Sequence, residues 1–173
     1  MSKYSITLNF FIPEELITIL KKLKFTEEIK YDWRKTGYAH CIIKALEIRN
    51  SEPSKKDILT WVKATNEVLS KNGYFRVLLE GIHNFPRIIY AAVKSEDLIH
   101  IHNNLCKALP SSQSQFEGKN YLPHVSLIES ISEVKQKYSS NTKIGNLVVK
   151  EIQLISWDLE NNNEPKILHC FKL

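Results

Sequence analysis

The sequence has no apolar run approaching the ~20 residues that a membrane-spanning helix needs. It also lacks a signal peptide's apolar segment and small-residue cleavage site, since a strand-like pattern begins at Tyr4. Cysteine is scarce: the three cysteines are widely spaced and none forms a Cys-x-x-Cys pair. That number and spacing argue against a disulfide framework and against a zinc knuckle. We therefore expect a cytoplasmic protein without membrane contact.

The bulk composition is that of a soluble globular protein. The chain has 173 residues, of which 43% are hydrophobic and 25% charged. This length fits a single domain over residues 1–173, and we expect it to be a monomer. The net charge of +5 is a mild basic excess, which slightly favours a polyanionic partner.

A histidine and a serine stand two positions apart in the stretch Tyr-Leu-Pro-His-Val-Ser-Leu, residues 121–127. If this stretch is a strand, its side chains alternate between two faces. His124 and Ser126 then share one face, while Val125 and Leu127 face a core. A histidine presented in this way can move a proton beside an anion that the hydroxyl holds.

A second histidine, His40, lies 84 positions earlier on a similar predicted strand over residues 38–48. The element order repeats at the same interval: 4–10 maps onto 88–94, and the helix over 13–24 maps onto 97–108. This predicts two similar lobes, roughly 1–84 and 85–173, each offering one histidine strand. The other patterns predict strands over 4–12, 74–81 and 88–93, within 146–157 and over 166–173. They predict helices over 54–73 (capped by Ser54 and Asp57), 96–109 and 131–138. The remaining segments are predicted as a turn at 161–163 and loops at 26–37 and 111–120.

The paired histidine stretches resemble the signature of the 2H phosphoesterases, in particular the 2′-5′ RNA ligase-like RNA 2′,3′-cyclic phosphodiesterases. That signature is two His-x-Thr/Ser-x tetrapeptides, here His-Cys-Ile-Ile at 40–43 and His-Val-Ser-Leu at 124–127. The resemblance covers nearly the whole chain. It implies an α+β bilobal fold, in which antiparallel-rich sheets form a central cleft with the helices outside.

The resemblance also implies a reaction, the hydrolysis of 2′,3′-cyclic phosphates on RNA ends or small nucleotides without a metal or other cofactor. His40 and His124 would be the general acid and the general base, and the reverse reaction would be 2′-5′ ligation. Ser126 would bind the phosphate. Ile42 stands where the first tetrapeptide should carry a hydroxyl, and Lys44, placed on the same face by alternation, is predicted to compensate as a phosphate ligand.

Other readings of these residues remain open. The chain could instead cleave 2′,5′-oligoadenylates, or it could bind RNA ends without turnover because Ile42 lacks the hydroxyl. Tyr38 and Tyr121 flank the histidine strands and are candidates for stacking on a base. His100 and His102 do not form a predicted metal site, because helical positions two apart point in different directions.

Overall fold

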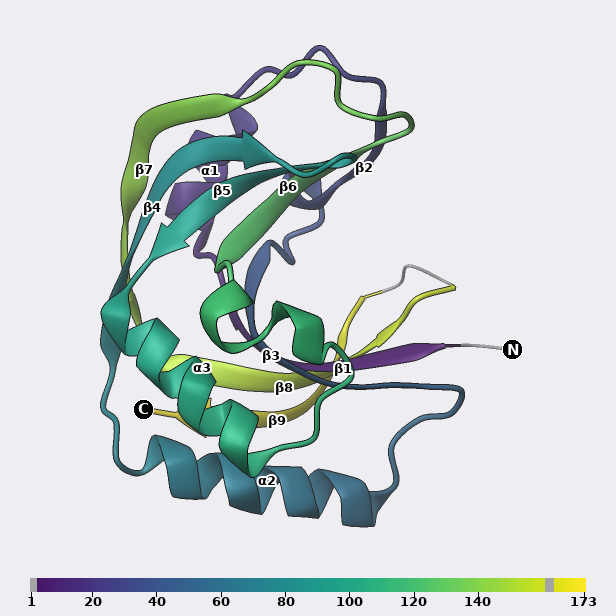
Figure 1. Ribbon diagram of the computed structural model, residues 1–173, viewed down its shortest axis with the longest axis vertical. Helices are drawn as coiled ribbons and strands as arrows, with labels where there is room; N and C mark the ends of the chain where they lie inside the picture. The colour runs from purple at the N-terminus through teal and green to yellow at the C-terminus, as the bar shows by residue number, and fades with distance from the viewer. Residues whose placement is uncertain (1–2, 161–163) are drawn as a thin grey trace.

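The computed structural model describes residues 3–160 and 164–173, whose strands form one antiparallel sheet around which three helices pack (Figure 1). The order across the sheet is β7-β4-β5-β6-β3-β1-β8-β9, and β2 pairs with β6 at one side. No helix in the described part of the chain is long and apolar enough to span a membrane. The strands are β1 (Tyr4–Phe11), β2 (Ile29–Asp32), β3 (His40–Arg49), β4 (Phe75–Asn84), β5 (Ile88–Lys94), β6 (His124–Ser130), β7 (Ser139–Val149), β8 (Glu151–Asp158) and β9 (Lys166–Lys172); the helices are α1 (Glu14–Lys21), α2 (Lys55–Leu69) and α3 (Glu96–Ala108).

The helices begin where the sequence places their caps. Ser54 accepts a hydrogen bond from the backbone N–H of Asp57, whose carboxylate accepts one from Ser54 N–H in return, so α2 starts with a capping box. The Ser95 side chain caps α3 by accepting a hydrogen bond from Leu98 N–H. Each helix buries one apolar stripe in a core shared with the sheet: Leu16, Ile17 and Leu20 of α1, Trp61 and Leu69 of α2, and Leu98, Ile101 and Leu105 of α3.

The two halves of the sheet meet at a narrow junction between β3 and β6. Cys41 and Val125 are the register partners there, and Figure 1 shows the sheet opening away from this line. On one side lie β6, β5, β4 and β7 with β2, and on the other lie β3, β1, β8 and β9. The division therefore does not follow the predicted lobes 1–84 and 85–173. β4 lies within the first lobe's residues yet pairs with β5 and β7, while β8 pairs with β1.

Two local predictions were wrong. The segment 26–37, predicted as a loop, contains the short strand β2 and a 3-10 turn over Trp33–Lys35. The helix predicted near 131–138 does not form, and the long strand β7 follows it instead. The strand predicted within 146–157 is confirmed as β8, and the end of β7 also falls in this range. The antiparallel pairing of β8 and β9 agrees with a closing hairpin, but its predicted turn at 161–163 lies outside the described residues.

Candidate functional site

The two sequence-predicted histidines lie on adjacent strands at the junction of the sheet. Because Cys41 of β3 pairs with Val125 of β6 in antiparallel register, His40 stands beside Ser126 and Ile42 stands beside His124. Cys41 and Val125 are fully buried, whereas these four neighbours lie on the opposite face and are at least partly exposed. His40 and His124 are thus diagonal neighbours on one face, and such positions are about 7–8 Å apart in an antiparallel pair. The structure thus brings together His40, His124 and Ser126.

The two imidazole rings are held by the same local contact. Nδ1–H of His40 donates to the carbonyl oxygen of Tyr38 at 2.8 Å, and Nδ1–H of His124 donates to that of Leu122 at 2.8 Å. A carbonyl oxygen can only accept, so Nδ1 carries the proton in each ring. Nε2 is therefore the atom that can accept a proton when the ring is neutral. When the ring is an imidazolium, Nε2–H is the group that can donate one.

Each ring also stands against two aromatic side chains. His40 lies 5.6 Å from Trp157 and 5.9 Å from Phe11, measured between ring centroids. His124 lies 5.1 Å from Tyr90 and 5.3 Å from Phe85. No local sequence pattern assigned these four aromatics to the site, since they come from strands and turns remote from the tetrapeptides in the chain. Their packing fixes the ring orientations and removes water from around them.

This packing shifts the titration of both histidines. Burial lowers the pKa of His40 below its ordinary value, and the nearby charge of His124 lowers it further, against a raising contribution from the Tyr38 carbonyl. Burial likewise lowers the pKa of His124, with the Leu122 carbonyl opposing it. Without a bound anion, both imidazoles are mostly neutral at pH 7.

Lys44 does not lie where alternation predicted. Leu8 pairs with Lys44 and Asn9 pairs with Ile42, so Ile43 is an extra residue that makes a bulge in β3. The bulge reverses the alternation and turns Lys44 to the face of Cys41, away from His40 and Ile42. The predicted phosphate contact of Lys44 does not fit this placement.

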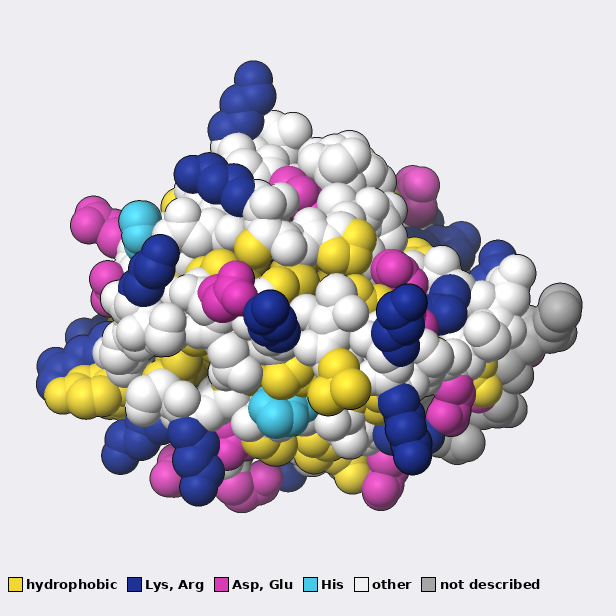
Figure 2. All heavy atoms as spheres, turned by 90° about the horizontal axis from the view of Figure 1, so that it is seen from below, with side chains coloured by type: hydrophobic (Ala, Val, Ile, Leu, Met, Phe, Trp, Pro, Cys, Tyr) yellow, Lys and Arg dark blue, Asp and Glu magenta, His cyan; other side chains and the backbone are white. Residues whose placement is uncertain are grey.

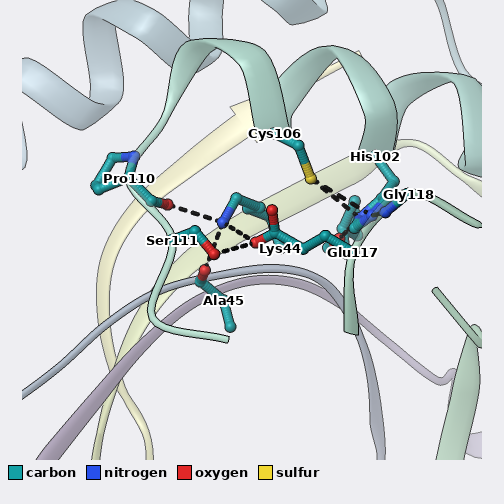
Figure 3. A network of polar contacts seen from close by, with 9 residues as sticks. Lys44, Ala45, His102, Cys106, Pro110, Ser111, Glu117 and Gly118 are labelled. Carbon is teal, nitrogen blue, oxygen red and sulfur yellow. Dashed lines mark hydrogen bonds and ion pairs between the residues drawn. The ribbon is translucent and has the colours of Figure 1, made fainter. Parts of the chain in front are cut away.

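The Lys44 ammonium instead closes a buried network between β3 and the loop after α3 (Figure 3). Its side chain is 0% exposed, and Nζ donates to the carbonyl oxygens of Ala45 (2.6 Å) and Pro110 (2.7 Å) and to Glu117 Oε1 (2.6 Å). Ser111 also donates to the Glu117 carboxylate. Lys44 therefore holds the 110–117 segment against the strand that carries His40.

Tyr121 belongs to the same buried layer. Its ring stacks on His102 with centroids 3.7 Å apart and planes 8° from parallel, and its hydroxyl donates to the carbonyl oxygen of Ile42 at 2.8 Å. One face of the ring and its hydroxyl are thus committed to structure, which does not favour the predicted stacking on a base. Tyr38 is half-buried, with its ring edge against Phe11 at 6.3 Å, and it remains a candidate for that role.

No cluster of three or more histidine, cysteine, aspartate or glutamate side chains that could hold a metal ion occurs among residues 3–160 and 164–173. His102 and Cys106 do approach each other, with Sγ 3.4 Å from Nε2, but the His102 ring is already engaged. Its Nδ1–H donates to the Ile43 carbonyl oxygen at 2.7 Å, and its Nε2 accepts from Gly118 N–H at 3.2 Å.

Comparison with known proteins agrees with this fold. A family described as the 2′-5′ RNA ligase superfamily matches residues 52–161, which include the second histidine tetrapeptide and exclude the first. Among solved structures, E. coli LigT complexed with NADP+ aligns with a TM-score of 0.71 at 15% identity, covering 99% of this chain and 98% of LigT. A Thermus thermophilus protein aligns with a TM-score of 0.72 at 15% identity, covering 98% of this chain and 97% of that one. A search of curated proteins found no match. The predicted α+β fold is confirmed.

Proposed function

The chain belongs to the 2′-5′ RNA ligase superfamily, and from that membership we propose that it opens 2′,3′-cyclic phosphates on RNA ends or small nucleotides by two-histidine acid–base catalysis. The observation that carries the proposal is the diagonal placement of His40 and His124 on one face, each with Nδ1–H bound to a carbonyl and with Nε2 lacking a hydrogen-bond partner among the described residues. A relative of the same fold, E. coli LigT, has been solved complexed with 3′-AMP, which is a nucleoside monophosphate, as is the proposed product of a small cyclic nucleotide.

The geometry suits an in-line displacement at phosphorus. A water attacks the phosphorus and loses a proton to one imidazole, while the bond from phosphorus to the ribose 3′ oxygen breaks and that oxygen takes a proton from the other, imidazolium ring. The product is a 2′-phosphate with a free 3′ hydroxyl. We assign His124 as the general base and His40 as the general acid. Ser126, beside His40, donates to a non-bridging oxygen and stabilises the charge that develops there.

The lowered histidine pKa values are consistent with a site in which a bound anion would raise them. A bound phosphodiester places a negative charge between the rings and raises the pKa of both. The ring that is to act as the acid then gains its proton as substrate binds. On the face seen in Figure 2, lysine and arginine side chains are interspersed with acidic and hydrophobic ones and do not gather in one patch.

The test is hydrolysis of a nucleoside 2′,3′-cyclic monophosphate, and separately of a 2′,5′-oligoadenylate, each in the presence of EDTA. We expect turnover of the cyclic phosphate, with losses of roughly 100- to 10,000-fold in His40→Ala and in His124→Ala. His100→Ala is the matched control, because His100 is an exposed histidine on α3. Turnover of the oligoadenylate alone would replace the proposed substrate, and binding of the cyclic phosphate without turnover would make this a non-catalytic member.

A further inference from the structure

Tyr90 of β5 stands beside the second histidine tetrapeptide. It is the register partner of Ser126, and since paired residues in a sheet point to the same face, it lies on the face of His124 and Ser126. Its ring centroid is 5.1 Å from that of His124, and the two planes are tilted by 60°. The side chain therefore borders the space that we assign to the phosphate.

The Tyr90 ring is held in one orientation. Phe85 stacks on it with centroids 4.5 Å apart and planes 26° from parallel. Phe85 is itself fixed, because its backbone N–H donates to the Ile88 carbonyl oxygen at 2.8 Å across the turn between β4 and β5. Tyr90 as a whole is only 7% exposed. A hydroxyl on so constrained a ring needs little reorganisation to donate to a bound group.

The Tyr90 hydroxyl has no hydrogen-bond partner among the described residues, although a buried tyrosine usually finds one. It is not enclosed either. The described side-chain oxygens and nitrogens that lack both partner and solvent belong to other residues, namely Asn9, Thr65, Ser130, Gln153 and Ser156. Burial raises the pKa of Tyr90, so the hydroxyl keeps its proton at neutral pH. It is a donor with nothing in the described chain to donate to.

The other half of the sheet has no equivalent donor among the described residues. There, Ile42 occupies the position that matches Ser126, and its register partner on β1 is Asn9. Asn9 is 0% exposed and its amide donates inward to Thr7 at 2.8 Å, so it does not reach a ligand. We propose that the Tyr90 hydroxyl donates to a non-bridging oxygen of the bound phosphate and supplies the second hydroxyl donor that Ile42 cannot. The inference rests on the proposed function and names a further catalytic residue for it.

The test is Tyr90→Phe, which removes the hydroxyl and keeps the ring that packs on His124. We expect kcat for a nucleoside 2′,3′-cyclic monophosphate to fall on the order of 100-fold, with a smaller change in KM. The two limbs of the pH profile should stay in place, because the histidines are untouched. Tyr74→Phe is the control, since Tyr74 is exposed at 66% and carries a hydroxyl outside the site. In the Tyr90→Phe background, adding Ile42→Thr should recover part of the loss.

An unchanged kcat in Tyr90→Phe would overturn the inference while leaving the proposed function intact. A shifted limb of the pH profile would also overturn it, since Tyr90 would then act by positioning His124. A second measurement does not depend on turnover: binding of a nucleoside 2′-monophosphate to the wild type and to Tyr90→Phe. We expect about 10-fold weaker binding in the variant. Equal affinity would reject the contact even if the wild type proved inactive.

Discussion

Cys41 of β3 lies directly opposite Val125 of β6, and these two residues are 84 positions apart in the chain. The same interval separates the bulge at Ile43 from a second bulge, at Leu127 in β6, where Ile128 pairs with Ile89 and Ser126 with Tyr90. A two-fold rotation at the Cys41–Val125 pair thus exchanges His40 with His124. The two halves of the site share one backbone design, but the third position of the tetrapeptide carries a hydroxyl only in the second, at Ser126.

That third position gives a prediction for Ile42, which is 39% exposed beside His124. Ile42→Thr places a hydroxyl opposite the one on Ser126, and we expect kcat for the cyclic phosphate to rise about 10-fold, because a transition-state donor is restored. Ile42→Val is the matched control, since valine has the shape of threonine without its hydroxyl. Equal rates for the two variants would show that a missing donor does not limit the reaction.

The pH dependence of hydrolysis follows from the lowered pKa of both histidines. kcat/KM reports the free enzyme, in which one ring must be neutral and the other protonated. With both pKa values below the ordinary ~6.5, we expect kcat/KM to peak on the acidic side of pH 6.5 and to fall towards neutrality. The profile of kcat should lie at higher pH, because bound phosphate raises both values. Coincident pH profiles of kcat and kcat/KM would contradict this expectation. The two apparent pKa values read from each profile belong to the histidine pair and not to one ring each.

The Lys44–Glu117 ion pair should matter for stability. Glu117→Leu leaves a fully buried ammonium without its counter-charge, and we expect the free energy of unfolding to fall by about 3–5 kcal/mol. Adding Lys44→Met should recover most of that loss. Lys94→Met breaks an exposed ion pair with Glu80 and should change the free energy of unfolding far less, because solvent screens such a pair. Urea unfolding measures the free energy of unfolding of each of these variants. A Lys44→Met variant of normal stability that no longer hydrolyses substrate would instead support a role at the phosphate.

His102 should make the fold sensitive to mild acid. Burial lowers its pKa, and its Nε2 accepts from Gly118 N–H, so the folded protein holds the neutral ring. The unfolded chain binds a proton near its ordinary pKa of ~6.5, so this contribution to stability is complete above that pH and is lost below it. We expect the free energy of unfolding to fall between pH 7 and pH 5. The fall should be smaller in His102→Gln, and an equal fall in both proteins would assign the effect to other histidines.

The sequence predicted the parts of the site that depend on local pattern. The shared face of His124 and Ser126 follows from the alternation of one strand. The caps at Ser54 and Ser95 can be recognised from four consecutive residues. The predicted placement of Lys44 was wrong because an extra residue, Ile43, reverses the alternation at Lys44. Alternation cannot detect a bulge whose cause is the pairing with β1. Tyr90 was missed for a related reason, since its place beside Ser126 depends on cross-strand register.

The missed strands have the same origin. β2 is only four residues long and mostly polar, and it is a strand because it pairs with β6. β7 alternates weakly and contains Gly145, which lies so close to Leu16 of α1 that an added Cβ would stand 2.6 Å from that side chain. Its strand conformation is imposed by β4 along nearly its whole length. Tertiary pairing, which the local pattern does not record, decides both elements.

The interleaved strand order sets a condition on synthesis. β1 leaves the ribosome before β3 and can pair with it soon afterwards, but the other edge of β1 stays unpaired until β8 is made, more than 140 residues later. Until then, the growing chain carries an open strand edge able to pair with other chains. Chains truncated before residue 151 should accordingly be prone to aggregation. Two fragments produced by a cut between residues 84 and 85 should fold only when they are combined.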